Sequence, residues 1–528
     1  MTLDLFCNRR LRAAEVKGWP HKPDEFRQAR RFKSLLHIYA PAQENWKKFV
    51  RAFMTHRNPY TGLTYAEDPA LFYVSLINEA SAFNFCEEPL YIKAYGEWLK
   101  KQNLWSVENF ARRDGLFMKF VSEVQCRFAQ EASRYMRDGL KCKTLVTDPN
   151  WMNNYALAPA REKTDIVDVH QYWDHPFFKP GSGGMPLLHN QTSVLKHALW
   201  NPRTILPIRI FGKPFVVSEF NYVFPNRHRA EGGPVYGAYA ALQDWGSAHI
   251  YTWHHYREGV RHELPIHGFN IAQDSLVQMA HRLAVLLFLR RDVRVAPSAV
   301  AQTFDLSMFD KKMKMVDTEP SLAFQNLGLF CRVGSLPVER KFPGVRTIRG
   351  DEDLTAQEKK FAASPVKVSE TGEIIYDSRK GQFQVVSPKT EIMILEQGTL
   401  AGKRLQATVR EKEFQIIALT AMDGKEIKES SSLLLFHLSN VTNEMIQFSS
   451  AAGHQVNDWG INKQLIRKAK ADVTLKLTPG KWKLQALDMG GVPKGEVALS
   501  ADKNSIGCSL DTTRFNGTMV YHLKKMEK

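Results

Sequence analysis

The stretch Leu71-Phe-Tyr-Val-Ser-Leu-Ile-Asn-Glu-Ala80 decides the fold, because an apolar run there ends abruptly in an amide and a carboxylate. Residues 71–77 are apolar apart from Ser75 and rich in large and β-branched side chains, which is typical of a strand buried on both faces of a parallel sheet. Strands of this kind carry functional residues at their carboxyl ends. Glu79 is therefore the first candidate catalytic residue.

Three later stretches repeat this pattern of an apolar run that ends in reactive side chains. Pro214-Phe-Val-Val-Ser-Glu-Phe220 places Glu219 where Glu79 stands in the first stretch. Asp165-Ile-Val-Asp-Val-His-Gln-Tyr-Trp173 ends in imidazole, phenol and indole groups, and His249-Ile-Tyr-Thr-Trp253 ends in an indole. A lone glutamate after a strand is more often a solvated loop residue or a helix N-terminal charge. Two at equivalent points predict a paired-carboxylate site with an acid and a nucleophile.

The order and spacing of these residues resemble the large retaining clan of (β/α)8 glycoside hydrolases that includes the family 5 cellulases and mannanases. In that clan Asn-Glu closes strand four, His-x-Tyr closes strand six, a second Glu closes strand seven and a Trp closes strand eight. The 219 − 79 = 140 residues between the two carboxylates accommodate three βα units of roughly 40 to 50 residues each. The matching residues here are Asn78, Glu79, His170, Tyr172, Glu219 and Trp253.

The resemblance implies a (β/α)8 barrel that hydrolyses β-linked glycosides with retention, without a cofactor or metal. Glu79 takes the position of the general acid/base and Glu219 that of the nucleophile. Asn78 is expected to hydrogen-bond the sugar 2-hydroxyl, while Tyr172 holds the nucleophile and His170 orients the pair. A core imidazole bonded to backbone is an equally good interpretation of His170.

Three tryptophans are candidate sugar-binding residues, because an indole packs against the apolar face of a sugar ring. Trp253 matches the clan's floor under the reacting sugar. Trp151 lies in the amide-rich loop 148–154, which could equally be a turn whose asparagines satisfy the backbone. Trp173 directly follows the His-x-Tyr motif. The adjacent His254 and His255 do not predict a metal site, because neighbouring strand residues point to opposite faces.

The resemblance also bears on how the chain is divided. Residues 1–7 fall where strand three of the clan belongs, so we expect 1–293 to form a barrel that lacks its first two βα units. Residues 294–365 are expected to connect it to a C-terminal β-sandwich, 366–528, because short alternating strands begin there. The sequence leaves the compartment open. If an N-terminal segment is missing, a secreted or periplasmic location is plausible for the full-length product.

Composition narrows the range of partners. The 528 residues carry a net charge of +17, with 44% hydrophobic and 24% charged residues, as in ordinary globular proteins. Basic runs at 8–12 and 27–33 lack any nucleic-acid-binding motif, and no apolar run reaches the ~18 residues of a membrane span. We therefore expect a carbohydrate substrate and neither nucleic acid nor membrane, with the oligomeric state open. The alternative is an inactive, carbohydrate-binding remnant.

Overall fold

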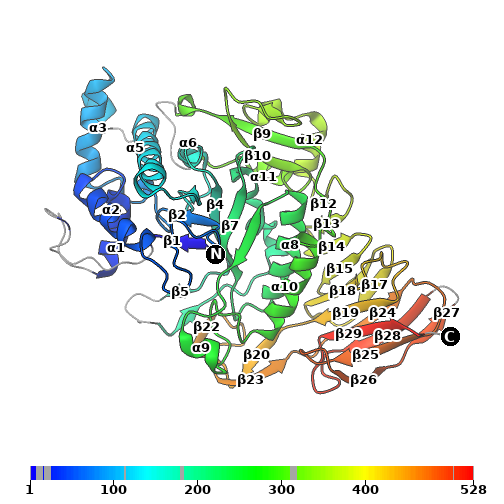
Figure 1. The fold of residues 1–528 in the computed structure, drawn as a ribbon. Helices are drawn as coiled ribbons and strands as arrows, with labels where there is room; N and C mark the ends of the chain where they lie inside the picture. The colour runs from blue at the N-terminus through cyan, green and yellow to red at the C-terminus, as the bar shows by residue number, and fades with distance from the viewer. Residues whose placement is uncertain are drawn as a thin grey trace.

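The computed structural model describes residues 2–6, 16, 25–111, 114–178, 184–309, 318–502 and 505–526. Six parallel strands pair in chain order in its first half, in sheets β1-β2-β3 and β4-β7-β8. A parallel bridge between Thr147 and Ile166 joins the two sheets. Consecutive parallel strands with helical crossovers are the arrangement of a βα-barrel (Figure 1). The strands are β1 (Thr2–Asp4), β2 (Tyr73–Ser75), β3 (Leu145–Thr147), β4 (Val167–Trp173), β7 (Phe215–Tyr222) and β8 (Ser247–Ile250).

This parallel sheet is strongly curled. The rings of Tyr73 on β2 and His249 on β8 pack edge to face, with centroids 6.3 Å apart. Four strand steps separate β2 from β8 in the sheet order, which would place them about 19 Å apart in a flat sheet. The carboxyl ends of the strands therefore converge on a common site.

Helices between the strands cover the outside of the sheet. They are α1 (Glu25–Leu35), α2 (Ala40–Met54), α3 (Pro89–Lys101), α4 (Val107–Ala111), α5 (Gly115–Arg134), α8 (Gly232–Leu242) and α10 (Ser275–Phe288). Helix α8 is buried on every side and packs tightly on α10. A Cβ on Gly233 would lie 2.0 Å from the carbonyl oxygen of Ala280, and one on Gly237 would lie 2.6 Å from Ala284 Cα. Only glycine permits this close approach.

The segment expected to connect the two domains, 294–365, has a folded structure of its own. Strands β9 (Ala299–Phe304), β10 (Arg332–Pro337) and β11 (Arg346–Ile348) form a parallel sheet in the order β10-β9-β11. Helices α11 (Leu322–Leu327) and α12 (Ala356–Ala363) accompany it. A parallel bridge between Ile210 and Ser335 ties this small sheet to the chain before β7.

The C-terminal part is a β-sandwich of a nine-stranded and a five-stranded antiparallel sheet, which are ordered β12-β13-β14-β15-β18-β19-β29-β25-β26 and β16-β17-β24-β28-β27. The nine strands are β12 (Val366–Val368), β13 (Ile374–Asp377), β14 (Gln382–Val386), β15 (Thr390–Leu395), β18 (Gln415–Ala421), β19 (Ser432–Leu438), β29 (Val520–Lys525), β25 (Trp482–Leu487) and β26 (Pro493–Val497). The five are β16 (Gly398–Ala401), β17 (Leu405–Val409), β24 (Lys470–Leu475), β28 (Ser505–Asp511) and β27 (Ser500–Asp502).

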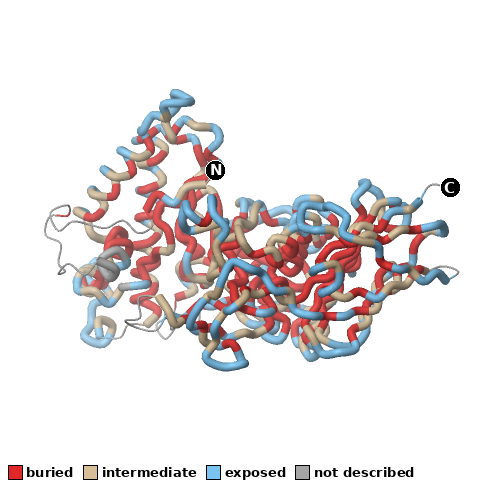
Figure 2. The backbone as a smooth tube through the Cα atoms, turned by 90° about the horizontal axis from the view of Figure 1, so that it is seen from below, coloured by how far each residue is buried: buried red, intermediate tan, exposed pale blue. Residues whose placement is uncertain are grey.

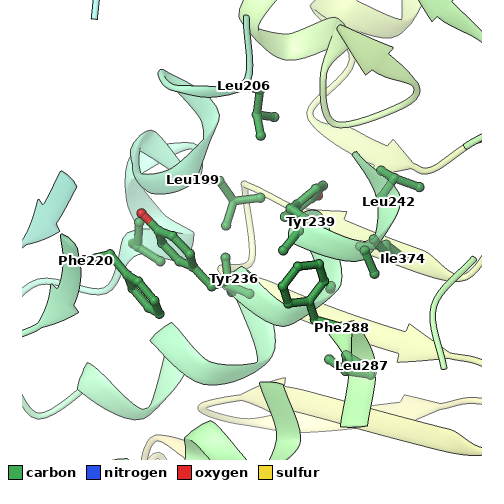
Figure 3. Packing of buried hydrophobic residues seen from close by; sticks show 14 of the residues in the cluster. Leu199, Leu206, Phe220, Tyr236, Tyr239, Leu242, Leu287, Phe288 and Ile374 are labelled. Atoms are coloured by element: carbon green, nitrogen blue, oxygen red, sulfur yellow. The ribbon is translucent and has the colours of Figure 1, made fainter. Parts of the chain in front are cut away.

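The large sheet is buried on both faces. On β15, Ile392 and Ile394 belong to the cluster that contains the barrel helices, whereas Met393 and Leu395 face the second sheet of the sandwich. Figure 3 shows Tyr239 of α8, Phe288 of α10 and Ile374 of β13 in one packed cluster. Buried residues accordingly extend from the barrel into the sandwich (Figure 2).

A second connection joins the loop after β4 to the C-terminal part. Strands β5 (Phe177–Phe178) and β6 (Leu187–Leu188) share a sheet with β21 (Gln447–Phe448) and β22 (Gln455–Asp458). The loop beside the barrel mouth is thereby held by residues more than 260 positions away in the sequence. Within the described ranges, no helix is both long and apolar enough to cross a membrane.

Candidate active site

The structure brings five of the predicted site residues together at the carboxyl ends of three strands. Asn78 and Glu79 follow β2, His170 and Tyr172 lie in β4, and Glu219 lies in β7. Strands β4 and β7 are parallel, with a bulge between Val169 and His170 after which His170 pairs with Glu219. A bulge re-aims the side chains that follow it, and here it places His170 between the two carboxylates.

The two glutamates converge on the imidazole of His170. His170 Nδ1 lies 3.0 Å from Glu79 Oε1 and 3.5 Å from Glu219 Oε2. One carboxylate oxygen of each glutamate and one His170 nitrogen all lie within 4.8 Å of one another. The Tyr172 hydroxyl donates a hydrogen bond to Glu219 Oε2. The His170 side chain is fully buried, while those of Glu79 and Glu219 keep 33% and 13% exposure, so the site opens on the Glu79 side.

Asn150, in the loop after β3, holds the Asn78-Glu79 pair in place. Its Oδ1 accepts the Glu79 backbone N–H at 2.8 Å, and its Nδ2 donates to Asn78 Oδ1 at 3.2 Å. Glu79 has a φ of +49°, a left-handed conformation that costs a non-glycine residue energy unless its surroundings hold it. Lys33 Nζ adds a bond of 2.6 Å to the Asn78 carbonyl. The sequence singled out the amide-rich loop but not this asparagine.

A second polar chain supports His170 from behind. His170 Nε2 lies 2.8 Å from Ser218 Oγ, and Ser218 Oγ lies 2.7 Å from Asp168 Oδ2. The Ser218 backbone N–H also donates to Asp168 Oδ1 at 3.0 Å. Asp168 is completely buried. The sequence did not point to either residue. Asp168 and Ser218 each lie inside an apolar run, on the same strand as a candidate site residue that drew the attention.

The electrostatics of the site separate the two carboxyls. Burial raises the pKa of Glu79, but the hydrogen bond and charge of His170 outweigh it and leave this pKa below its ordinary value. Burial raises the pKa of Glu219 to about 7, against the opposing effects of His170 and Tyr172. Burial alone would lower the pKa of His170, yet bonding to Glu79 and the charges of Glu219 and Asp168 raise it to about 9. The resting site therefore holds its proton on His170, with Glu79 ionised.

The aromatic wall of the site differs from the one expected. Tyr251, at the end of β8, and Phe269 pack edge to face on Tyr172, with ring centroids 6.1 and 5.2 Å away. Trp253 is 54% exposed and lines a separate cavity of about 580 Å³ with Val260 and Gln273. The structure thus places Tyr251, rather than Trp253, beside the residue that holds Glu219.

The other two tryptophans also lie outside this cluster. Trp173 is buried in the barrel core, where its Nε1 donates to the Thr192 carbonyl at 2.9 Å and its ring faces those of His197 and Trp200. Trp151 lies 40% exposed in the loop after β3. Sugar contact by either side chain stays a prediction.

Glu79, His170 and Glu219 are close enough to hold a cation. A metal would have to displace the proton of His170 Nδ1, which bonds Glu79, and the raised pKa of this histidine favours the proton. The adjacent histidines have separate partners. His254 Nδ1 lies 2.9 Å from the Tyr256 carbonyl, and His255 Nδ1 lies 2.8 Å from Asn270 Oδ1. The basic run at 8–12 lies outside the described residues.

Fold and site together define a βα-barrel protein with a paired-carboxylate centre. No protein-family model matches the chain, and no curated protein matches it. Among solved structures, the chain is similar to the endo-1,4-β-D-mannanase of Thermotoga petrophila RKU-1 at 17% identity, over 54% of this chain and 74% of that chain, with a TM-score of 0.33.

Two longer matches extend over most of this chain. The exo-carrageenase GH42 of Bacteroides ovatus is 12% identical over 92% of this chain and 69% of that chain, with a TM-score of 0.36. The rhamnosidase of Novosphingobium sp. PP1Y is 9% identical over 92% of this chain and 48% of that chain, with a TM-score of 0.29. All three are glycoside hydrolases. TM-scores this low support no conclusion about function, so the proposed function rests on the geometry of the site.

Proposed function

We propose that this protein is a retaining glycoside hydrolase that acts on β-linked glycosides by double displacement. The observation that carries the proposal is the approach of a Glu79 and a Glu219 carboxylate oxygen to within 4.8 Å. Retention requires carboxyls about 5 Å apart, whereas inversion needs about 6.5 to 9.5 Å to admit a water. The spacing supports a direct attack by one carboxylate on the anomeric carbon.

Glu219 suits the nucleophile. Its Oε2 is occupied by the Tyr172 hydroxyl and lies 3.5 Å from His170 Nδ1. These donors hold the carboxylate in one orientation and leave its other oxygen for the sugar. Ionised Glu219 is the attacking form, and Tyr172 favours that form because a hydrogen bond donated to a carboxylate lowers its pKa.

Glu79 suits the acid/base, because it is the more exposed carboxylate and can reach a leaving oxygen. It must be protonated to protonate that oxygen, and in the resting site the nearest proton is on His170 Nδ1, 3.0 Å away. One transfer along this bond creates the reactive state, with an acid at Glu79 and a carboxylate at Glu219. Asn78, whose amide is held by Asn150, is the group for the sugar 2-hydroxyl.

A second candidate function is sugar binding without cleavage. It is favoured by the resting ionisation of Glu79, whose pKa lies below its ordinary value although an acid catalyst needs it raised. In this case the pocket would bind glycan without cleaving it. The wild type and both glutamate variants would then show only the uncatalysed rate of hydrolysis.

The test is hydrolysis of a panel of aryl β-glycosides of glucose, mannose and galactose. Glu79→Gln and Glu219→Gln are each expected to lower kcat by at least about 100-fold. Glu67→Gln is the matched control, because Glu67 is an exposed glutamate in the loop before β2. Equal activity of the wild type and both site variants would exclude the proposal.

Azide assigns the two roles. With an activated aryl β-glycoside, Glu79→Ala is expected to yield the β-glycosyl azide, because azide attacks the glycosyl-enzyme and the configuration is retained. Glu219→Ala is expected to yield the α-azide by direct displacement. The opposite pattern would exchange the roles of Glu79 and Glu219, and rescue of neither variant would exclude both roles.

A further inference from the structure

We propose that the buried carboxylate of Asp168, acting through Ser218, holds on His170 the proton that loads the acid/base Glu79. The inference rests on the proposed glycosidase function and adds to it a relay that lies behind the sugar site. Asp168 contacts no substrate in this scheme, so it is a positioning residue.

Three short polar contacts make a continuous path. Asp168 Oδ2 lies 2.7 Å from Ser218 Oγ, Ser218 Oγ lies 2.8 Å from His170 Nε2, and His170 Nδ1 lies 3.0 Å from Glu79 Oε1. Each distance is that of a good hydrogen bond. The path runs from a completely buried carboxyl to the partly exposed one.

The direction of these bonds places the proton on His170. Ser218 Oγ donates to Asp168 Oδ2 at 2.7 Å, and the Ser218 backbone N–H donates to Asp168 Oδ1 at 3.0 Å, so Asp168 accepts both bonds. The Ser218 oxygen can then accept from His170 Nε2–H, while His170 Nδ1–H donates to ionised Glu79. In this arrangement Asp168 is an anion, His170 carries both ring protons, and each member of the chain has a partner.

The loading step moves one proton equivalent without net chemistry. The His170 Nδ1–H bond breaks as the Glu79 Oε1–H bond forms, which leaves His170 neutral with Nε2–H still donating to Ser218. Glu79 is then the acid, and Asp168 stays ionised. Glu79 gives this proton to the leaving oxygen. When water later attacks the glycosyl-enzyme, Glu79 takes a proton from it and returns that proton to His170 Nδ1.

The charges around Asp168 and His170 favour this state. Burial raises the pKa of Asp168 to about 6, and the charge of Asp4 on β1 adds to the effect, while His170 and Ser218 oppose it. The fully buried guanidinium of Arg161 and the phenol of Tyr73 also interact electrostatically with this carboxyl. At neutral pH Asp168 is therefore mostly ionised, and its charge is one of those that raise the pKa of His170 to about 9.

The test compares leaving groups in Asp168→Asn. Asparagine keeps both contacts to Ser218 but carries no charge, so His170 loses its second proton more readily and Glu79 stays ionised. Phenyl β-glycosides, which need an acid, are expected to lose about 10- to 100-fold in kcat/KM. 2,4-Dinitrophenyl β-glycosides, which leave without an acid, are expected to change less than about threefold. The loss should be larger at pH 8 than at pH 5.5, where solvent can protonate Glu79.

Matched variants separate the relay from the fold. Ser218→Ala breaks the path and should reproduce the leaving-group dependence, whereas Ser218→Thr keeps the hydroxyl on a β-branched side chain suited to the strand and should restore wild-type rates. Asp165→Asn is the control, because Asp165 lies just before β4 and bonds Arg137, away from the carboxylates.

The outcomes also separate the relay from the proposed function. A wild type inactive on both substrates contradicts the function itself. An active wild type with Asp168→Asn slowed equally on both substrates, or on neither, overturns the relay. If Asp168→Asn does not fold, the Ser218 pair decides: equal rates for alanine and threonine would overturn it.

Discussion

At the scale of single residues, His170 is the group that couples the two carboxylates. It bonds Glu79, lies beside Glu219 and is fully buried, so its charge favours the ionised form of both glutamates. Its direct bond to Glu79 lowers the pKa of that carboxyl, whereas burial raises the pKa of Glu219 against the effect of His170. Pairs of titratable groups whose pKa values are pushed apart are the mark of divided acid and base roles.

The rate should follow a bell-shaped pH profile with its optimum between about 7 and 9. Glu219, with a pKa raised to about 7, must lose its proton to attack, so the rate rises through that value. His170, with a pKa raised to about 9, must keep the proton destined for Glu79, so the rate falls above it. Measuring kcat/KM from pH 4 to 11 tests this, and an optimum near pH 5 would contradict it.

Removing the Tyr172 hydroxyl should weaken the nucleophile. Tyr172→Phe loses a hydrogen bond to a charged group, worth about 1.5 to 3 kcal/mol, and so should lower kcat/KM by about 10- to 100-fold. Because that bond lowers the pKa of Glu219, the acid limb of the pH profile should also move to higher pH. Tyr60→Phe, at a 95% exposed tyrosine, is the control. An unshifted acid limb would argue against this role.

At the scale of helices and strands, the apolar runs predicted the parallel strands that position the site. Within the run at 71–77, residues 73–75 form β2, every residue except the 46% exposed Phe72 is buried, and Glu79 follows as expected. Asn150, Ser218 and Asp168 could not be foreseen, because their contacts depend on the bulge in β4 and on side chains from other strands. The sequence analysis chose Trp253 and not Tyr251, because the sequence does not show which aromatic residue at the end of β8 turns toward Tyr172.

Helix α8 owes its position to two glycines. Gly237→Ala would place a Cβ 2.6 Å from Ala284 Cα and push α8 away from α10. Overpacking of this kind costs about 1 to 3 kcal/mol, so the urea midpoint should fall. Gly490→Ala, whose Cβ would meet only the Asp488 carboxylate at 3.4 Å, is the control. Equal midpoints for the two variants would refute this account of the helix pair.

At the scale of the whole molecule, barrel and sandwich share one core. The sandwich was predicted from alternating strands, but β15 and β18 are buried along their whole lengths, because one face of the sheet covers the barrel helices. Alternation cannot reveal a second covered face. Arg229 reinforces the junction, since it forms a buried ion pair with Asp274 and donates to the Val441 carbonyl.

Stability should fall as pH rises from about 4.5 to 8, partly because of Glu231. Burial raises the pKa of this carboxyl to about 8, so in that window the folded protein keeps a proton that the unfolded chain has lost. Ionisation inside the fold then costs on the order of 3 to 5 kcal/mol. Glu231→Gln, which can still bond Ser193 and Val194, should flatten the decline in urea titrations. An unchanged slope would contradict this assignment.

The most direct test of the central claim is to trap the nucleophile. The protein is incubated with a 2,4-dinitrophenyl 2-deoxy-2-fluoro-β-glycoside of the sugar it hydrolyses, and the labelled peptide is identified by mass spectrometry. We expect one fluoroglycosyl group, attached to Glu219, and none in Glu219→Gln. Hydrolysis without any adduct, or an adduct on a different residue, would contradict a double displacement at Glu79 and Glu219.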